Sequence, residues 1–63
     1  MIYVHNTTGG KYEVIDLEAK LQIEGFWVEA VIYQKHPQKG NQRFVRTKNS
    51  FNEKFTPIEK YIF

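Results

Sequence analysis

The sequence predicts an all-β domain: a small, strongly bent barrel of four or five short antiparallel strands, with one short helical or 3-10 turn near residues 50–55. Two observations carry this prediction. Residues 26–34 and 43–47 are rich in β-branched and aromatic side chains, which are typical of strands. The connector between them, residues 36–41, contains the Pro, Gly and Asn that favour turns. The two segments therefore predict a β-hairpin at the centre of the fold.

Alternation along the first arm of this hairpin predicts two largely apolar faces. One face carries Phe26, Val28, Ala30 and Ile32. The other carries Trp27, Glu29, Val31 and Tyr33. In the second arm, Val45 fits the first face, whereas Phe44 and Arg46 lie on the side of Tyr33 if the register permits.

These two faces predict different roles. One side forms ordinary core. The other carries Trp27, Tyr33, Phe44 and Arg46, and aromatic rings beside a guanidinium can stack on a planar ligand or hold an anion. The alternative is that a small barrel wraps around itself and buries Trp27 and Phe44.

The residues before the hairpin predict two further strands. Residues 1–5 alternate as a strand does, and the Asn, Thr and Gly residues at 6–10 predict a turn. The strand pattern resumes at 11–17. There the apolar side chains fall on opposite faces, with Tyr12 and Val14 on one and Ile15 and Leu17 on the other.

Residues 16–23 are open to two interpretations. Glu18 to Gln22 are good helix formers, so a turn of helix competes with a long bent strand. We favour the strand, because the segment is too short for an independent helix and leads through Gly25 directly into the hairpin.

The segment after the hairpin predicts one short helical turn. Ser50 and Glu53 have the spacing of a capping box. Phe51 and Phe55, four residues apart, would then both face the core. Residues 58–63 finish as an edge strand or as an apolar tail. Several short strands with one helical turn before the last predict a barrel of the SH3-like kind, with an open antiparallel sheet as the alternative.

Length and composition predict a single domain, residues 1–63. The chain has no cysteine, so the ten aromatic residues, rather than a disulfide, supply the stability that so small a chain needs. A small homo-oligomer would serve the same purpose, and both monomer and homo-oligomer stay open. We see neither a signal-peptide pattern nor an apolar run near the roughly 20 residues of a membrane span, so a cytoplasmic location without membrane contact is expected.

Formal charge is unevenly distributed along the chain. Residues 1–34 carry two basic and five acidic side chains, a net charge of −3, whereas residues 35–63 carry seven basic and two acidic side chains, a net charge of +5. A basic side that attracts anions and a merely solvated lysine-rich surface are both compatible with this distribution.

Short motifs spread over most of the chain carry a resemblance. They are Tyr3-x-His5, Gly10 to Val14, Val31-Ile32-Tyr33-Gln34, Phe44-Val45-Arg46-Thr47 and Phe51 to Phe55. They resemble a family of small uncharacterised domains of bacteria and phages, whose pattern runs Tyr-x-His, Tyr-x-Val, Val-Val-Tyr and Trp-Val-Arg-Pro. The resemblance implies a short SH3-like barrel with His5, Tyr33 and Arg46 at the family's most characteristic polar positions. This chain differs in having Phe44 for tryptophan, Thr47 for proline and a longer middle loop.

Catalysis is not expected, and the sequence predicts neither a cofactor nor a metal site. Ser50 is the only serine, and it would have to act as a nucleophile with His5 or His36 while also capping a helix. Two distant histidines without cysteine match no zinc spacing. Gly9-Gly10 alone indicates a turn rather than a phosphate site.

Binding is therefore the predicted class of function. The candidate binding residues are His5, Trp27, Tyr33, Arg43, Phe44 and Arg46. The favoured hypothesis is a phage or bacterial accessory protein that binds and modulates a host protein through its hairpin or an edge strand. The alternative is capture of an anionic ligand, a nucleotide or single-stranded nucleic acid, on the aromatic and arginine face. For Arg46 itself, pairing with an acid such as Glu29 and binding an external anion are equally open.

Overall fold

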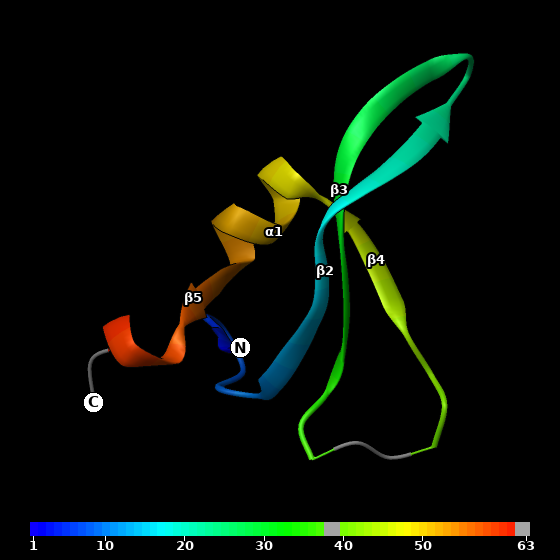
Figure 1. Ribbon diagram of the computed structural model, residues 1–63. Helices are drawn as coiled ribbons and strands as arrows, with labels where there is room; N and C mark the ends of the chain where they lie inside the picture. Colours follow the sequence, from blue (N-terminus) through cyan, green and yellow to red (C-terminus); the bar gives the residue numbers. More distant parts are fainter. Residues whose placement is uncertain (38–39, 62–63) are drawn as a thin grey trace.

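The computed structural model describes residues 1–37 and 40–61, which form one antiparallel sheet with a short helix (Figure 1). The strands are β1 (Ile2–His5), β2 (Lys11–Ile23), β3 (Phe26–Lys35), β4 (Phe44–Thr47) and β5 (Phe55–Pro57). Helix α1 (Lys48–Lys54) joins β4 to β5, and the 3-10 helix η1 (Ile58–Lys60) follows β5. Among the described residues, no helix is long and apolar enough to span a membrane.

The strand order is β4-β3-β2-β1-β5, and every neighbouring pair is antiparallel. This confirms the prediction of a mainly β domain with antiparallel strands and one short helix. Within the described residues the sheet is not closed into a barrel, because β4 and β5 form its two edges. The open antiparallel sheet, which the sequence left as the alternative, therefore describes the arrangement.

The side chains of β3 and β4 share faces as predicted, but the predicted roles of the two faces were wrong, because the core cluster lies on the face of Val31 and Tyr33 rather than on the face of Phe26. The directly opposed pairs are Tyr33 and Phe44, Ile32 and Val45, and Val31 and Arg46. Because opposed residues share a face of a sheet, Phe44 and Arg46 lie on the side of Tyr33 and Val31, as predicted. The second strand begins at Phe44, so Arg43 precedes it. The connecting loop was predicted at residues 36–41, of which 38–39 lie outside the described residues.

Strand β2 runs as a strand through residues 16–23, which confirms the favoured interpretation of this segment. Pairing with β3 outweighs the helix propensity of its side chains. The register against β3 shifts between Val14 and Asp16, and again between Asp16 and Ala19. Asp16 Oδ1 accepts a hydrogen bond from the backbone N–H of Glu18 at 2.8 Å, inside the second irregularity. β2 is therefore bent by two bulges.

These bulges change which side chains of β2 face the core. Leu17 packs against the core together with Tyr12 and Val14, so its predicted place on the opposite face was wrong. Simple alternation fails there, because each bulge inserts one unpaired residue and moves the following side chains to the other face.

The core lies between the sheet and α1. The buried cluster consists of Val31, Tyr33, Phe51 and Phe55. Phe51 stacks on Phe55 with ring centroids 4.4 Å apart and planes 9° apart, which confirms that both rings face the core. Phe51 also contacts the ring of Tyr3 edge-on at 5.0 Å, so one helical side chain connects β1, β3 and β5. Aromatic rings thus supply the core volume that was expected of them.

Helix α1 begins earlier than predicted. Its N-cap is Thr47, whose Oγ1 accepts a hydrogen bond from the backbone N–H of Ser50 at 3.3 Å. Ser50 therefore lies inside the first turn, and its hydroxyl accepts a hydrogen bond from Arg46. The predicted capping box of Ser50 and Glu53 was wrong, because an N-cap needs the extended backbone that Thr47 has.

The last strand also comes earlier than predicted. Residues 55–57 pair with β1, whereas residues 58–60 form η1. The predicted edge strand or apolar tail at 58–63 therefore begins with a 3-10 helix, and its last two residues lie outside the described part of the chain.

Asn6 fastens the end of β1 to the segment after α1. Its backbone N–H donates to the carbonyl of Lys54 at 2.8 Å, and its side-chain amide donates to the carbonyl of Glu53 at 3.2 Å. The Thr56 hydroxyl donates to Asn6 Oδ1 at 2.6 Å. Carbonyls at the end of α1 therefore find partners in the first turn of the chain.

Residues 19–30 form a two-stranded hairpin that extends beyond the rest of the sheet, and we call it the ribbon. β4 pairs with β3 only as far as Ala30, and β1 pairs with β2 only as far as Glu13. The ribbon turns at Glu24 and Gly25, which both have positive φ (47° and 85°), as in a type I′ hairpin. It extends away from α1 and the other strands (Figure 1). The radius of gyration is accordingly 12.1 Å, against about 10.6 Å for a compact domain of this length.

Candidate functional site

All five strands contribute to one pocket of about 220 Å³ beside the core, which we call the ring pocket. It is lined by His5, Thr8, Tyr12, Tyr33, Phe44, Arg46 and Phe55. Four of the six predicted binding residues therefore meet in one place: His5, Tyr33, Phe44 and Arg46. Local alternation put three of these residues on one face, and the pairing of β1 with β2 and β5 brings His5 to them.

Arg46 is held by neutral groups. Its Nε donates to the Tyr33 hydroxyl at 2.9 Å, and its Nη1 donates to the Ser50 hydroxyl at 3.2 Å. The guanidinium carbon lies 5.7 Å from the centroid of the Phe55 ring, a cation–π distance. Among the described residues Arg46 forms no ion pair, so the pairing with Glu29 that was one of its two predicted roles is not made.

His5 is fixed by the turn that follows β1. Its Nδ1 accepts hydrogen bonds from the backbone N–H groups of Thr7 and Thr8, at 3.2 and 3.4 Å. A neutral imidazole that accepts at Nδ1 carries its hydrogen on Nε2, so the other ring nitrogen is a donor. The ring stands edge-on to Phe55, with centroids 4.9 Å apart and planes 86° apart.

The walls of the ring pocket are aromatic. The rings of Tyr33 and Phe44 lie 5.6 Å apart and are tilted by 32°. Tyr12 meets both rings edge-on, and it meets Phe55 edge-on at 5.4 Å. Tyr33 is 5% exposed, so its ring belongs to the core while its hydroxyl reaches Arg46. The pocket thus combines aromatic walls with one guanidinium whose bonded partners carry no charge.

Trp27 and Arg43 are not among the residues that line the ring pocket. Trp27 points to the same face of β3 as Tyr33. It lies on the ribbon, however, beyond the last residue of β3 that pairs with β4, and it is 65% exposed. Its predicted place on a common surface with Tyr33 was wrong, and so was the alternative that a barrel buries it. Phe44, by contrast, is half-buried against the core cluster. Arg43 is exposed ahead of β4.

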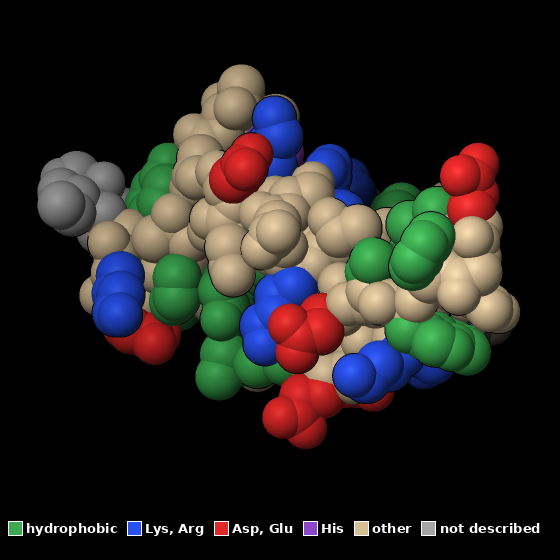
Figure 2. All heavy atoms as spheres, turned by 90° about the horizontal axis from the view of Figure 1, so that it is seen from above, with side chains coloured by type: hydrophobic (Ala, Val, Ile, Leu, Met, Phe, Trp, Pro, Cys, Tyr) green, Lys and Arg blue, Asp and Glu red, His purple; other side chains and the backbone are tan. Residues whose placement is uncertain are grey.

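The ribbon has one face that is entirely apolar. Opposed residues of β2 and β3 place on it Ala19, Leu21, Ile23, Phe26, Val28 and Ala30. The opposite face carries Lys20, Gln22, Trp27 and Glu29. Phe26 is 75% exposed and Ile23 is 45% exposed, and Figure 2 shows hydrophobic side chains gathered at this end of the molecule, on the right.

Sequence reasoning missed this face. It expected Phe26 and Val28 to form core, and it did not pair them with the residues before Gly25. The signal was available: apolar residues alternate on both sides of a two-residue turn that ends in glycine, which is a hairpin pattern.

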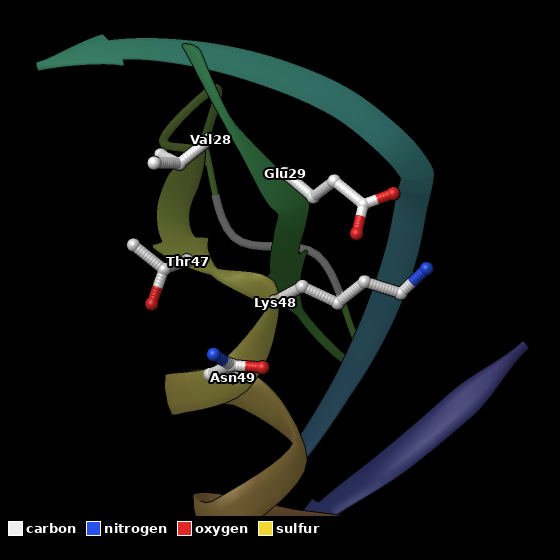
Figure 3. Close-up of a pocket in the computed structure, with 5 residues that line it drawn as sticks. All are labelled: Val28, Glu29, Thr47, Lys48 and Asn49. Carbon is white, nitrogen blue, oxygen red and sulfur yellow. The ribbon is translucent and has the colours of Figure 1, made fainter. Parts of the chain in front are cut away.

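A second pocket, of about 320 Å³, lies at the base of the ribbon, where β4 ends and α1 begins. We call it the notch, and it is lined by Val28, Glu29, Thr47, Lys48 and Asn49 (Figure 3). Glu29 and Lys48 extend to one side of β3, whereas Val28 and Thr47 lie on the other. Because Val28 also belongs to the apolar face of the ribbon, the notch continues that face.

No three His, Asp or Glu side chains in residues 1–37 and 40–61 lie close enough together to hold a metal ion. Comparison of the chain with known protein families, with characterised proteins and with solved structures finds no match. The ribbon and the ring pocket are therefore interpreted from their geometry and chemistry.

Proposed function

We propose that this protein is a non-enzymatic binding module that inserts its ribbon into a groove of a partner protein. The observation that carries the proposal is the apolar face of the ribbon, on which Phe26 is 75% exposed and Ile23 is 45% exposed, beyond the last residue paired with β4. An exposed apolar surface of this kind marks an interaction site more often than a free surface.

Energetics favour a partner on the ribbon. A lone two-stranded hairpin is at best marginally stable in water, because neither face gains a packing layer. Full burial of a side chain such as Phe26 contributes about 1.5–3 kcal/mol. Burial of Phe26 by a partner therefore stabilises the complex, and the partner also orders the residues around Phe26.

The geometry of the ribbon end indicates the shape of the partner site. Phe26 lies on the apolar face and Trp27 on the opposite face, so the end of the ribbon presents one ring on each side. Aromatic side chains of this kind carry much of the energy of protein interfaces. A groove that closes on both faces of the ribbon would contact both rings, with the turn at Glu24 and Gly25 entering first.

The charge on and beside the ribbon indicates which charge the rim of the partner's groove carries. The ribbon carries two acidic side chains and one basic side chain, and the three residues before it, 16–18, add two more acidic side chains, so residues 16–30 have a net charge of −3. Complementary charge speeds encounter and suppresses wrong partners. We therefore expect a groove with an apolar floor and a basic rim.

The resemblance to small bacterial and phage domains supports a more specific proposal, in which the chain is an accessory protein that modulates a host protein in the cytoplasm. The antiparallel sheet and the helix before the last strand are compatible with an open relative of the SH3-like arrangement. Under this proposal the ribbon, rather than the hairpin of β3 and β4 or an edge strand, is the surface that meets the host protein.

The test is capture of a partner by immobilised protein from a bacterial lysate, followed by titration calorimetry with the purified partner. The variant is Phe26→Ser, and Val45→Ser is the matched control, because Val45 is 51% exposed but lies on β4. We expect Phe26→Ser to weaken binding at least about tenfold and Val45→Ser to leave it unchanged. Equal binding by both variants would contradict the proposal. Sedimentation of the wild-type chain and of Phe26→Ser tests for self-association. If the wild-type chain self-associates and the variant does not, the ribbon binds a second copy of this chain rather than a different protein.

A further inference from the structure

We infer that the ring pocket is a second binding site, for a small planar anion that consists of one aromatic ring bearing a carboxylate or a phosphate group. This inference goes beyond the proposed docking function, because neither Phe26 nor Trp27 lines the pocket. It rests on the setting of Arg46, on the rings around it and on the size of the pocket.

The guanidinium of Arg46 is oriented before any ligand binds. The Tyr33 and Ser50 hydroxyls accept from two of its nitrogens, and Phe55 lies 5.7 Å away under the cation. Arginine has five N–H donors, and these two hydrogen bonds use two of them. Because both accepting groups are neutral, the positive charge is retained, and the remaining donors suit a carboxylate or a phosphate.

The other lining groups suit a flat ring. Tyr12, Phe44 and Phe55 provide ring faces and edges around the same space. Aromatic rings attract one another in stacked or edge-to-face contacts at such distances. His5 adds a polar group, since its Nδ1 is occupied by backbone N–H groups and its Nε2 is left as a donor.

Size restricts the ligand. The pocket volume of about 220 Å³ is below the roughly 300 Å³ at which sites for drug-sized ligands begin. One ring with one anionic group is therefore the expected occupant. A free aryl carboxylate or aryl phosphate meets this description, whereas a purine nucleotide, with its bicyclic base and its phosphate on a ribose, exceeds it.

The experiment is an NMR titration of the unmodified protein, followed through the backbone amides and the Arg46 Nε–H signal. The probes are phenyl phosphate, benzoate and adenosine monophosphate. Benzyl alcohol and cyclohexanecarboxylate are the controls, which lack the negative charge and the aromatic ring respectively. We expect saturable shifts at the ring pocket with a Kd on the order of 1 mM for benzoate or phenyl phosphate, and little change at the Trp27 indole.

Matched variants separate a site from general attraction. Arg46→Gln and Arg43→Gln change the net charge equally, but only Arg46 lines the pocket. We expect Arg46→Gln to weaken binding at least about tenfold and Arg43→Gln to weaken it less than about twofold. Equal weakening by the two variants would overturn the inference, because it would indicate diffuse electrostatic attraction.

The wild-type titration decides the matter even if Arg46→Gln fails to fold. Absence of saturable shifts with all three aromatic anions would refute the site. So would equal affinity for benzyl alcohol or for cyclohexanecarboxylate. Tightest binding of benzoate or phenyl phosphate would support the inference, and tightest binding of adenosine monophosphate would contradict the limit of one ring with one anionic group. Loss of the docking function in Phe26→Ser affects none of these outcomes.

Discussion

Arg46 donates a hydrogen bond from Nε to the hydroxyl of Tyr33, at 2.9 Å, across the pairing of β3 with β4. Tyr33 is 5% exposed and packed in the core, so its hydroxyl is a fixed acceptor. The guanidinium therefore takes its position from the core rather than from solvent. A group positioned in this way loses little conformational freedom when it binds a ligand.

Removal of this hydroxyl tests how strongly the core holds Arg46. We expect Tyr33→Phe to lower the free energy of unfolding by about 1–2 kcal/mol, because a partly buried charged donor loses its acceptor. Tyr12→Phe is the matched control, since the Tyr12 hydroxyl forms no hydrogen bond within the described residues. Urea unfolding of both variants gives the comparison, and similar losses in both would show that the Arg46 bond contributes little.

The start of α1 gives a second prediction. Thr47→Ala should destabilise the protein by about 1 kcal/mol, because the backbone N–H of Ser50 loses its cap. Glu53→Ala, which removes the acceptor of a capping box, should change the stability by less than about 0.5 kcal/mol, since the side chain of Glu53 is exposed and does not cap the helix. Thermal unfolding by circular dichroism measures both. A larger loss for Glu53→Ala would support the capping box that the sequence predicted.

The core and the ribbon should respond differently to the loss of a phenyl ring. Phe51→Ala should cost about 3–5 kcal/mol, because a fully buried ring leaves a cavity. The whole domain is expected to have roughly 3–9 kcal/mol of stability, so this variant should lose at least about a third of it and unfold at a much lower temperature than the wild type. Phe26→Ala should cost less than about 1 kcal/mol, since only cross-strand contact is lost. Near-ultraviolet circular dichroism of the two variants distinguishes these outcomes.

The turn of the ribbon gives predictions of opposite sign. Gly25→Ala should destabilise the ribbon by about 1 kcal/mol, because φ is 85° there and a β-carbon would meet no neighbouring atom that could offset the strain. Glu24→Asn should stabilise it by about 0.5 kcal/mol, since asparagine accepts positive φ more readily than glutamate does.

Amide hydrogen exchange measures both turn variants. Ribbon amides should exchange several-fold faster in Gly25→Ala and more slowly in Glu24→Asn, whereas the amides of β1 should not change. A uniform change across the sheet would mean that the ribbon opens only with the whole domain.

The sequence by itself determined the features that depend on near neighbours. The faces of β3 follow from alternation, and the direction of Phe51 and Phe55 follows from their spacing of one helical turn. The choice of strand for residues 16–23 also came from local evidence, namely the short length of the segment and its link through Gly25. These features need no information about distant parts of the chain.

Only the tertiary structure decided which faces are covered and which distant residues meet. The bulges of β2 move Leu17 to the core side, and no local pattern places them, because register is set by pairing with β3. Trp27 and Tyr33 face the same side of β3, but β4 does not pair with β3 as far as Trp27, which is therefore exposed. His5 joins Arg46 because β1 pairs with both β2 and β5. Burial and proximity depend on contacts between remote segments, whereas periodicity records only the direction of each side chain along its own strand.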